Sequence, residues 1–200
     1  KNISKRCREY LINNFTITHA KISTQIKSKD GTIKFLFCLE DGSKCEGVLI
    51  PEKNRVTACI SSQVGCSFAC KFCATGNMKR KRNIMSYEIL DQVNLMMDKS
   101  YKEYNMGITN IVYMGMGEPL VNYQNVVDSI NYLTSKEALN MSSKRITVST
   151  VGVSKMIKKL ADEKLKVNLA VSLHSANNLK RSEIMDINNS NDLESLKESL

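Results

Sequence analysis

Residues 56–73, VTACISSQVGCSFACKFC, are the stretch of the sequence that decides the expected fold. The run 56–61 is largely apolar, which is typical of a buried strand. A loop containing Gly65 follows, and it carries Cys66, Cys70 and Cys73 in the spacing C-x3-C-x2-C. Parallel β/α folds place their ligand-binding groups in loops that follow strands. The stretch therefore predicts a β/α fold whose first strand leads into a metal-binding loop.

The same order of strand, loop and helix repeats along the rest of the chain. Further strands are expected at 108–114, 145–150 and 167–173. Helices are expected from residue 86 onward, around 126–133, at 154–164 and from 192. Four such units predict an α/β fold with a parallel sheet. Because four units do not close an eight-unit barrel, the sheet is either open or incomplete, and an end within the last helix indicates a fragment.

A small β-hairpin is expected ahead of these units. Residues 33–40 and 45–50 are the predicted strands, and Asp41-Gly42 between them is a strong turn signal. Pro51 is expected to stop the second strand. Residues 1–30 are polar and mixed, and only the end of a helix is expected in them.

Three cysteines within eight residues suit a soft metal centre. A structural zinc ion needs four protein ligands and a complete ferredoxin-type cluster needs four cysteines, whereas this loop supplies three. Three thiolates on a four-iron cluster leave one iron open for the amino and carboxylate groups of S-adenosylmethionine (SAM). Electron transfer to the SAM sulfonium breaks a C–S bond and forms a 5′-deoxyadenosyl radical, which the protein must hold and shield.

Two alternatives stay open for this loop. A zinc site would recruit His19 or His174 as a fourth ligand, although neither is near the loop in sequence. Phe68 and Phe72 alternate with the cysteines, and they are expected either to pack over a cluster or simply to anchor the loop.

The ends of the later strands also carry groups suited to a ligand. The second strand ends in Gly115-Met116-Gly117-Glu118-Pro119, where glycines permit close approach and the Glu118 carboxylate can accept the SAM ammonium. Ser149-Thr150 ends the third strand, and Ser172-Leu173-His174 ends the fourth. Each group alone is more often a turn or a helix cap. Together on one rim, they predict the SAM site.

Composition and charge narrow the class of protein. Apolar residues make up 42 % of the 200 residues, and no run of about 18 apolar residues is present to span a membrane. Lys and Arg number 29 against 20 Asp and Glu, a surplus of 9 that favours nucleic acid as a partner or reflects an AT-rich genome. Seven cysteines, an odd number, indicate metal chemistry in the reducing cytoplasm rather than a disulfide framework.

Several motifs taken together resemble the RlmN family of radical SAM RNA methyltransferases. They are CISSQVGC at 59–66, GMGEP at 115–119, RITVSTVG at 145–152 and AVSLHSANN at 170–178, with RCREYLI at 6–12 and VLIPE at 48–52 upstream. The resemblance implies methylation of C2 of adenine 2503 in 23S rRNA and of adenine 37 in tRNAs. It implies a partial (β/α)6 radical SAM barrel at 55–200, incomplete at its C-terminus, after the end of an accessory region and the hairpin at 1–54.

The resemblance also implies a role for each matching residue. Cys66, Cys70 and Cys73 would hold a 4Fe-4S cluster, and Glu46 would be the proton acceptor. Cys59 would form a disulfide during turnover with a methyl-carrying cysteine, which is expected beyond Leu200. Two SAM molecules would be used per turnover, and the SAM site would be lined by Gly117, Glu118, Ser149, Ser172, Leu173 and His174. Cys7, Cys38 and Cys45 have no assigned role.

The sequence also leads to expectations about binding partners and to two alternative functions. The resemblance implies 23S rRNA and tRNA as substrates, a flavodoxin- or ferredoxin-type electron donor, a monomer and no membrane association. The basic run 79–82, Lys-Arg-Lys-Arg, would hold RNA phosphates or is a solvated loop. The rivals are the related enzymes that methylate adenine C8 and confer antibiotic resistance, and a zinc-dependent RNA-binding module without catalysis.

Overall fold

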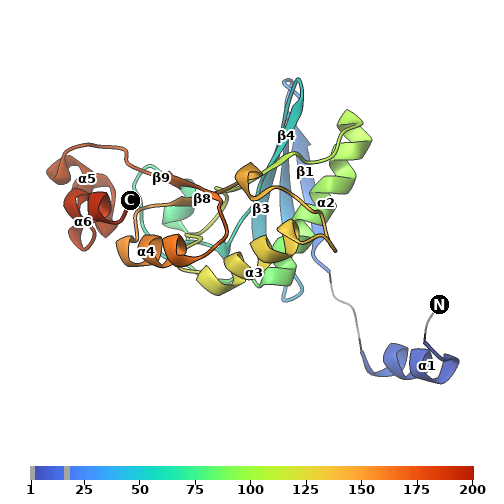
Figure 1. Ribbon diagram of the computed structural model, residues 1–200. Helices are drawn as coiled ribbons and strands as arrows, with labels where there is room; N and C mark the ends of the chain where they lie inside the picture. Colours follow the sequence, from blue (N-terminus) through green and yellow to red (C-terminus); the bar gives the residue numbers. More distant parts are fainter. Residues whose placement is uncertain (1–2, 16–18) are drawn as a thin grey trace.

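The strands of the chain pair into one continuous seven-stranded sheet in the order β1-β2-β3-β4-β7-β8-β9 (Figure 1). The computed structural model describes residues 3–15 and 19–200. The strands of this sheet are β1 (Lys21–Lys27), β2 (Ile33–Cys38), β3 (Lys44–Glu52), β4 (Arg55–Cys59), β7 (Asn110–Tyr113), β8 (Ile146–Thr150) and β9 (Asn168–Val171). Two short strands, β5 (Gln63–Val64) and β6 (Arg82–Asn83), form a separate ladder.

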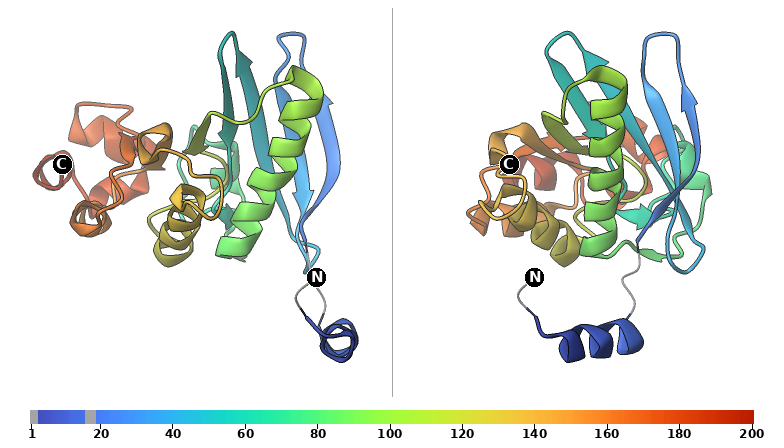
Figure 2. Two further views of the ribbon diagram at one scale, coloured as in Figure 1. Left: turned by 45° about the vertical axis from the view of Figure 1, so that its right-hand side comes forward. Right: turned by 90° about the vertical axis from the view of Figure 1, so that its right-hand side faces the viewer.

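The helices complete the chain order. The α-helices are α1 (Lys5–Asn14), α2 (Ser86–Tyr104), α3 (Tyr123–Thr134), α4 (Ser154–Asp162), α5 (Asn178–Ile184) and α6 (Leu193–Glu198). The 3-10 helices are η1 (Ala74–Asn77), η2 (Ser143–Arg145) and η3 (Asp186–Asn189). No residue of α1 is buried, and α1 lies apart from the sheet (Figure 2). No helix in the described residues is long and apolar enough to cross a membrane.

The half of the sheet formed by β4, β7, β8 and β9 is parallel, as predicted. Cys59 pairs with Val112, Val112 with Thr147, and Thr147 with Asn168. The order β4-α2-β7-α3-β8-α4-β9-α5 gives the four expected β/α units. Each observed strand lies within two residues of its predicted bounds. Parallel strands place all their carboxyl ends at one edge of the sheet, and the loops that follow them meet there.

The other half of the sheet is antiparallel and larger than the predicted hairpin. Strand β3 continues through Pro51, which pairs with Val56 of β4, so the prediction that Pro51 ends the strand is wrong. The predicted hairpin is therefore built into the main sheet, because β3 pairs along β4 as well as β2. The proposed boundary between 54 and 55 falls in the β3–β4 turn. The division of the chain into 1–54 and 55–200 stays a prediction.

Strand β1 was not expected from the sequence. It pairs antiparallel with β2 at the edge of the sheet, with a bulge between Ile22 and Thr24. Six of its seven residues are exposed, and Ile22 is the half-buried residue that packs against the core. A strand without a buried face leaves no alternation of apolar residues in the sequence.

The core lies between the sheet and the helices α2, α3 and α4 (Figure 2). Ile89, Val93 and Met96 of α2 keep the predicted helical spacing and are fully buried. On β3, Gly47 lies where a Cβ atom would be 2.6 Å from the Met96 Cε atom. A glycine there allows α2 to pack directly on the antiparallel strands.

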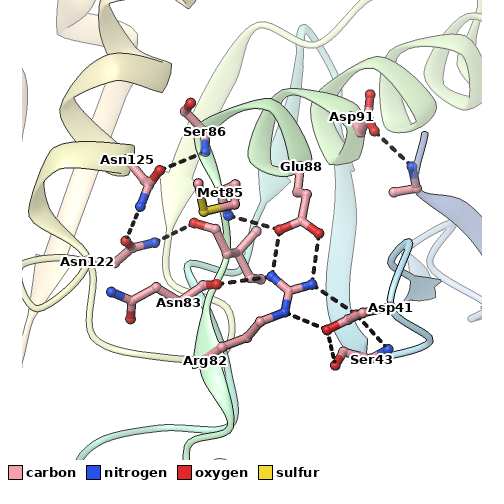
Figure 3. A network of polar contacts seen from close by, with 12 residues as sticks. Asp41, Ser43, Arg82, Asn83, Met85, Ser86, Glu88, Asp91, Asn122 and Asn125 are labelled. Carbon is pink, nitrogen blue, oxygen red and sulfur yellow. Dashed lines mark hydrogen bonds and ion pairs between the residues drawn. The ribbon is translucent and has the colours of Figure 1, made fainter. Parts of the chain in front are cut away.

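An ion network ties the β2–β3 turn to the start of α2 (Figure 3). The Arg82 guanidinium donates to both carboxylate oxygens of Glu88, at 2.7 and 2.8 Å, and to both oxygens of Asp41, at 2.7 and 3.0 Å. Glu88 also accepts the Met85 N–H at 2.9 Å, where a carboxylate is favoured by the helix dipole. The antiparallel half is thus fixed to the helix layer by charge as well as by apolar packing.

Candidate functional site

A pocket of about 290 Å³ opens at the carboxyl edge of the parallel strands. One wall comes from the loop after β4, with Cys66, Phe68, Cys70, Phe72 and Cys73. The other walls are the ends of β7, β8 and β9, including Gly115, Gly117, Glu118, Ser149, Thr150 and Ser172. The predicted rim of strand-end groups and the cysteine loop therefore meet in one place.

The cysteine loop is held against the end of α5. Cys70 is buried with Met185 and Ile187, and the Lys71 N–H donates to the Ile184 carbonyl at 3.0 Å. Within the loop, the Cys73 N–H donates to the Cys70 carbonyl at 3.0 Å. Gly76 passes so close that a Cβ atom there would lie 2.5 Å from the Cys70 carbonyl oxygen. These contacts fix the backbone that carries the three thiols.

The turn after β7 packs tightly on the loop after β4. The Ser62 and Gln63 N–H groups both donate to the Met116 carbonyl, at 2.9 and 3.1 Å. Gly117 has φ of +97° and lies against the Gln63 side chain, where a Cβ atom would clash. Only glycine adopts that conformation without strain and leaves this space. The GMGEP motif is therefore explained by backbone packing as well as by its place in the pocket wall.

Glu118 lines the pocket but is 2 % exposed. Its carboxylate accepts the Leu120 N–H at 3.1 Å and the Val151 N–H at 2.9 Å, so it ties the end of β7 to the end of β8. Burial raises the pKa of Glu118 above its ordinary value, although the hydrogen bonds from Val151, Thr150 and Leu120 oppose that shift. Its predicted contact with the SAM ammonium stays a prediction, because two of its acceptor positions already hold backbone amides.

The remaining predicted SAM residues divide into two groups. Ser149 and Ser172 line the pocket directly. Leu173 and His174 are exposed, and the His174 ring packs on Phe72 at a tilt of 33°, with 3.8 Å between ring centroids. His174 has φ of +56°, a left-handed conformation that turns the chain after β9 toward the cysteine loop. Phe72 therefore contacts the segment that follows β9. Its role is not limited to anchoring the cysteine loop.

Glu46 and Cys59 lie on the face of the sheet opposite α2. Cys45, Gly47 and Leu49 alternate with Glu46 and are buried in the core, so Glu46 points the other way. Cys59 pairs with Val48, the next residue on that same face of β3. The Glu46 carboxylate pairs with the Lys34 Nζ atom at 2.8 Å.

The thiol of Cys59 is less acidic than usual. Burial raises the pKa of Cys59 to about 11, and a backbone hydrogen bond from Met114, a pocket residue, works against the shift. The same face of the sheet thus carries a carboxylate and a buried thiol, with the thiol next to the pocket wall.

Comparison with known proteins identifies the family. The model of the radical SAM superfamily matches residues 60–199. The chain belongs to the radical SAM superfamily. The match covers the cysteine loop and all the strand ends that surround the pocket.

Individual relatives of this radical SAM chain agree. It is 59 % identical to a protein of Cytophaga hutchinsonii and 54 % identical to one of Flavobacterium psychrophilum, both named "Probable dual-specificity RNA methyltransferase RlmN". All of the chain is matched, but only 54 % and 57 % of these relatives, so it spans about half their length. These relatives confirm the resemblance to the RlmN family.

A solved structure confirms the fold. The crystal structure of a radical SAM methyltransferase from Sphaerobacter thermophilus matches with a TM-score of 0.92 at 38 % identity. The match covers 99 % of this chain and 58 % of that one. The predicted β/α architecture of the radical SAM core is therefore correct, and the antiparallel strands belong to the same matched unit.

The residues present fit the cofactors that the radical SAM superfamily implies, a 4Fe-4S cluster and SAM. Burial, together with the negative forms of Cys66 and Cys73, raises the pKa of Cys70 to about 11, which places the three thiols in one electrostatic neighbourhood. In residues 3–15 and 19–200, no three His, Cys, Asp or Glu side chains converge as ligands of a single metal ion would. Thiolates that bind different irons of one cluster stay farther apart than that.

Two predictions about other ligands have different outcomes. His19 is not at the radical SAM cysteine loop, because its Nδ1 atom lies 3.2 Å from the Asp91 carboxylate on α2. His174 does reach the loop through Phe72, although the two lie far apart in sequence.

All seven cysteines are free, so the disulfide expected for Cys59 has no support within this chain.

The basic run next to the radical SAM pocket is not uniform. Lys79, Arg80 and Lys81 are exposed, as an RNA-binding role requires. Arg82 instead pairs with Glu88 and Asp41, so neither predicted role of the run, phosphate binding or a solvated loop, describes this residue. The hydrogen bonds that Arg82 donates to both carboxylates raise the pKa of Arg82 above its already high value.

Sequence reasoning missed three polar residues that position the radical SAM pocket. The Ser61 hydroxyl donates to the Glu46 carbonyl at 2.6 Å and accepts the Met116 N–H at 2.8 Å, so it joins β3 to the GMGEP turn. Gln63 accepts the Glu118 N–H at 3.0 Å, and Asn122 donates to the Ser62 and Ile84 carbonyls. The only signal in the sequence was their position between a strand and the helix that follows it.

Proposed function

We propose that this chain is the radical SAM core of an RlmN-type enzyme that methylates C2 of adenine in rRNA and tRNA. The observation that carries the proposal is the pocket in which three cysteines of one loop meet three strand ends, beside a sheet face that carries Glu46 and Cys59. The names of the relatives support the substrate class.

The pocket residues would hold the two cofactors. Cys66, Cys70 and Cys73 would bind the 4Fe-4S cluster through their thiolates, because a bound metal favours the deprotonated form of a coordinating thiol. Bound cluster and SAM together supply a carbon radical that can activate an unreactive C–H bond. Gly117 leaves room for close approach, and Ser149 and Ser172 offer hydroxyls to the polar groups of SAM.

Glu46 and Cys59 would complete the reaction on the base. Adenine C2 lies between two ring nitrogens and is electron-poor, so ordinary transfer of a methyl cation from SAM does not occur there. A radical route requires a base to remove the C2 proton, and Glu46 is a carboxylate on the adjoining sheet face, next to the residue of that face that pairs with Cys59. The Cys59 thiol would then attack the methyl-carrying cysteine to release the product. That cysteine is expected outside these 200 residues.

The substrate base must leave its stack to reach such a pocket. Exposed Lys79, Arg80 and Lys81 follow the cysteine loop and offer positive charge for the flanking phosphates. Lys21 and Lys44 both pair with Cys38 in the sheet register and so share the face that carries Glu46. An electron donor of the flavodoxin or ferredoxin type, and a monomeric state, stay predictions.

Anaerobic reconstitution of the complete enzyme with iron, sulfide and SAM tests the proposal. We expect about four irons per chain and a C2-methylated adenine, detected by mass spectrometry of the RNA digest. The Glu46→Gln variant should keep its iron and still cleave SAM, but should lose product by about 100-fold or more, as expected for a general base. Glu52→Gln, an exposed carboxylate on the same strand, is the matched control.

Three outcomes would contradict the proposal. A C8 methyl without a C2 methyl would assign the chain to the related resistance enzymes. A colourless protein with one zinc would support a binding module. A Glu46→Gln variant as active as the Glu52→Gln control would remove Glu46 from the reaction.

A further inference from the structure

Arg181 on α5 is a buried cation without a carboxylate partner. Its side chain is fully buried, and the chain forms no ion pair to it within the described residues. Arg82, by contrast, forms ion pairs with two carboxylates, those of Asp41 and Glu88. A buried charge is costly unless an opposite charge or many hydrogen bonds compensate for it.

Five oxygen atoms surround the Arg181 guanidinium, and all of them belong to neutral groups. The Nη2 atom donates to the Val151 carbonyl at 2.7 Å and to the Ser172 carbonyl at 3.5 Å, and Nε donates to the Leu173 carbonyl at 3.2 Å. Nη1 donates to Asn188 Oδ1 at 2.6 Å and to the Asn191 carbonyl at 3.3 Å. These dipoles solvate the cation, but its net charge of one remains.

The same residue joins the strand ends to the cysteine loop. Val151 follows β8, and Ser172 and Leu173 follow β9, so Arg181 holds two of the pocket walls by their carbonyls. One turn further along, Met185 packs on Cys70, and the Ile184 carbonyl accepts the Lys71 N–H. Burial lowers the pKa of Arg181, and the negative form of Cys70 raises it again. The cysteine loop therefore packs one helical turn from Arg181, and a thiolate of that loop would supply the negative charge that the guanidinium lacks.

We propose that Arg181 is a positioning residue that serves as the buried counter-charge of the cysteine loop, and that it raises the reduction potential of the bound cluster. The inference rests on the proposed cluster site. Net charge and hydrogen bonding around a cluster are the main means by which a protein sets its potential. A fixed positive charge in a low-dielectric interior favours the more negative, reduced state of the cluster.

Two variants of the reconstituted enzyme test this, with the midpoint potential read from an EPR-monitored redox titration. Arg181→Met removes the charge together with its hydrogen bonds. Asn188→Asp places a carboxylate 2.6 Å from Nη1, in nearly the same shape, and neutralises the charge while Arg181 stays in place. We expect the potential to shift to lower values in both variants, by a similar amount, because each leaves the site with no net charge.

Matched controls make the same chemical changes far from the pocket. Arg145→Met removes one exposed cation at the start of β8, and Asn168→Asp adds one carboxylate at the start of β9. Both lie at the opposite strand ends from the cysteine loop, and both should leave the potential unchanged. Asn168→Asp also loses an amide donor, to the Lys144 carbonyl, as Asn188→Asp loses its donor to Ser182.

The iron content of each protein shows whether a negative result contradicts the proposed function or the role of Arg181. A parent enzyme that takes up no cluster contradicts the proposed function rather than the role of Arg181. If Arg181→Met does not fold, Asn188→Asp decides alone. An Asn188→Asp enzyme with the iron content and the potential of the parent would overturn the inference and leave Arg181 as a clamp on the strand ends.

Discussion

The parallel and antiparallel halves of the sheet contribute to the site in different ways. The parallel half offers its strand ends: the cysteine loop after β4, the glycine turn after β7 and the serines at the ends of β8 and β9. The antiparallel half offers a strand face, on which Glu46 projects away from the core. Carboxyl ends of parallel strands gather at one edge, whereas those of antiparallel strands alternate between edges. A residue on an antiparallel strand therefore reaches a site at that edge by lying on the correct face.

The two halves also differ in what a one-residue change does. Moving a strand-end loop by one residue displaces a ligand by a few ångströms, but shifting β3 by one residue would turn Glu46 into the core. The contacts that fix β3 are accordingly strong. Ser61 joins the Glu46 carbonyl to the GMGEP turn, and Arg82 joins the β2–β3 turn to α2.

The largest expected effect compares one buried cysteine from each half. Cys70→Ala should abolish the iron content and the brown absorption of the reconstituted enzyme, because two thiolates cannot replace three. Cys45→Ala, in the antiparallel core, should keep its iron and lose about 1 kcal/mol of unfolding free energy through a small cavity. Iron analysis and chemical denaturation measure both. Retention of the full cluster by Cys70→Ala would refute the ligand assignment.

A smaller effect concerns the link between the halves. Arg82→Met leaves the buried Glu88 carboxylate without its partner and should cost about 3 kcal/mol of unfolding free energy. Arg55→Met breaks only the exposed pair with Glu52 and should cost less than about 0.5 kcal/mol. Equal losses in the two variants, by urea denaturation, would mean that the network does not join the halves.

The same link predicts a pH dependence. Hydrogen bonds from Arg82 and then Ser43 hold the pKa of Asp41 well below its usual range. Its contribution to stability is therefore present above the unfolded pKa of about 3.9 and is lost as the pH falls toward the depressed value. Because Asp41 is largely exposed, the contribution is small. Denaturation series between pH 5 and pH 2 should show a shallower decline for Arg82→Met than for the parent.

The smallest effect concerns the exposed cations beside the pocket. Changing Lys79 and Arg80 together to Ala should weaken RNA binding several-fold and reduce the salt slope of log K by about 1 to 2. Lys29 and Lys53 lie in exposed turns at the opposite strand ends, and the same double change there is the control. Binding measured across salt concentrations compares them. Identical salt slopes for the two double variants would place the RNA elsewhere.

Much of the site could be predicted because its signals are local. The cysteine spacing, the positive φ of Gly117 and the short β/α repeats are each expressed within a few neighbouring residues, and the structure brings them together at one edge. Strand β1 and helix α5 escaped prediction for the opposite reason. The exposed faces of β1 leave no alternating pattern, and α5, with seven residues, is too short for a clear period.

The sequence by itself determined the chemistry of this protein: which thiols, carboxylates and hydroxyls are present, and that they follow strands. Only the tertiary structure decided which of those groups remain available to a ligand. Arg82 resembled an RNA-binding residue but pairs with two acids, Glu118 is hydrogen-bonded to backbone amides, and Arg181 is a buried cation near the thiols. The physical reason is that burial and pairing depend on neighbours distant in sequence, whereas residue type and spacing do not.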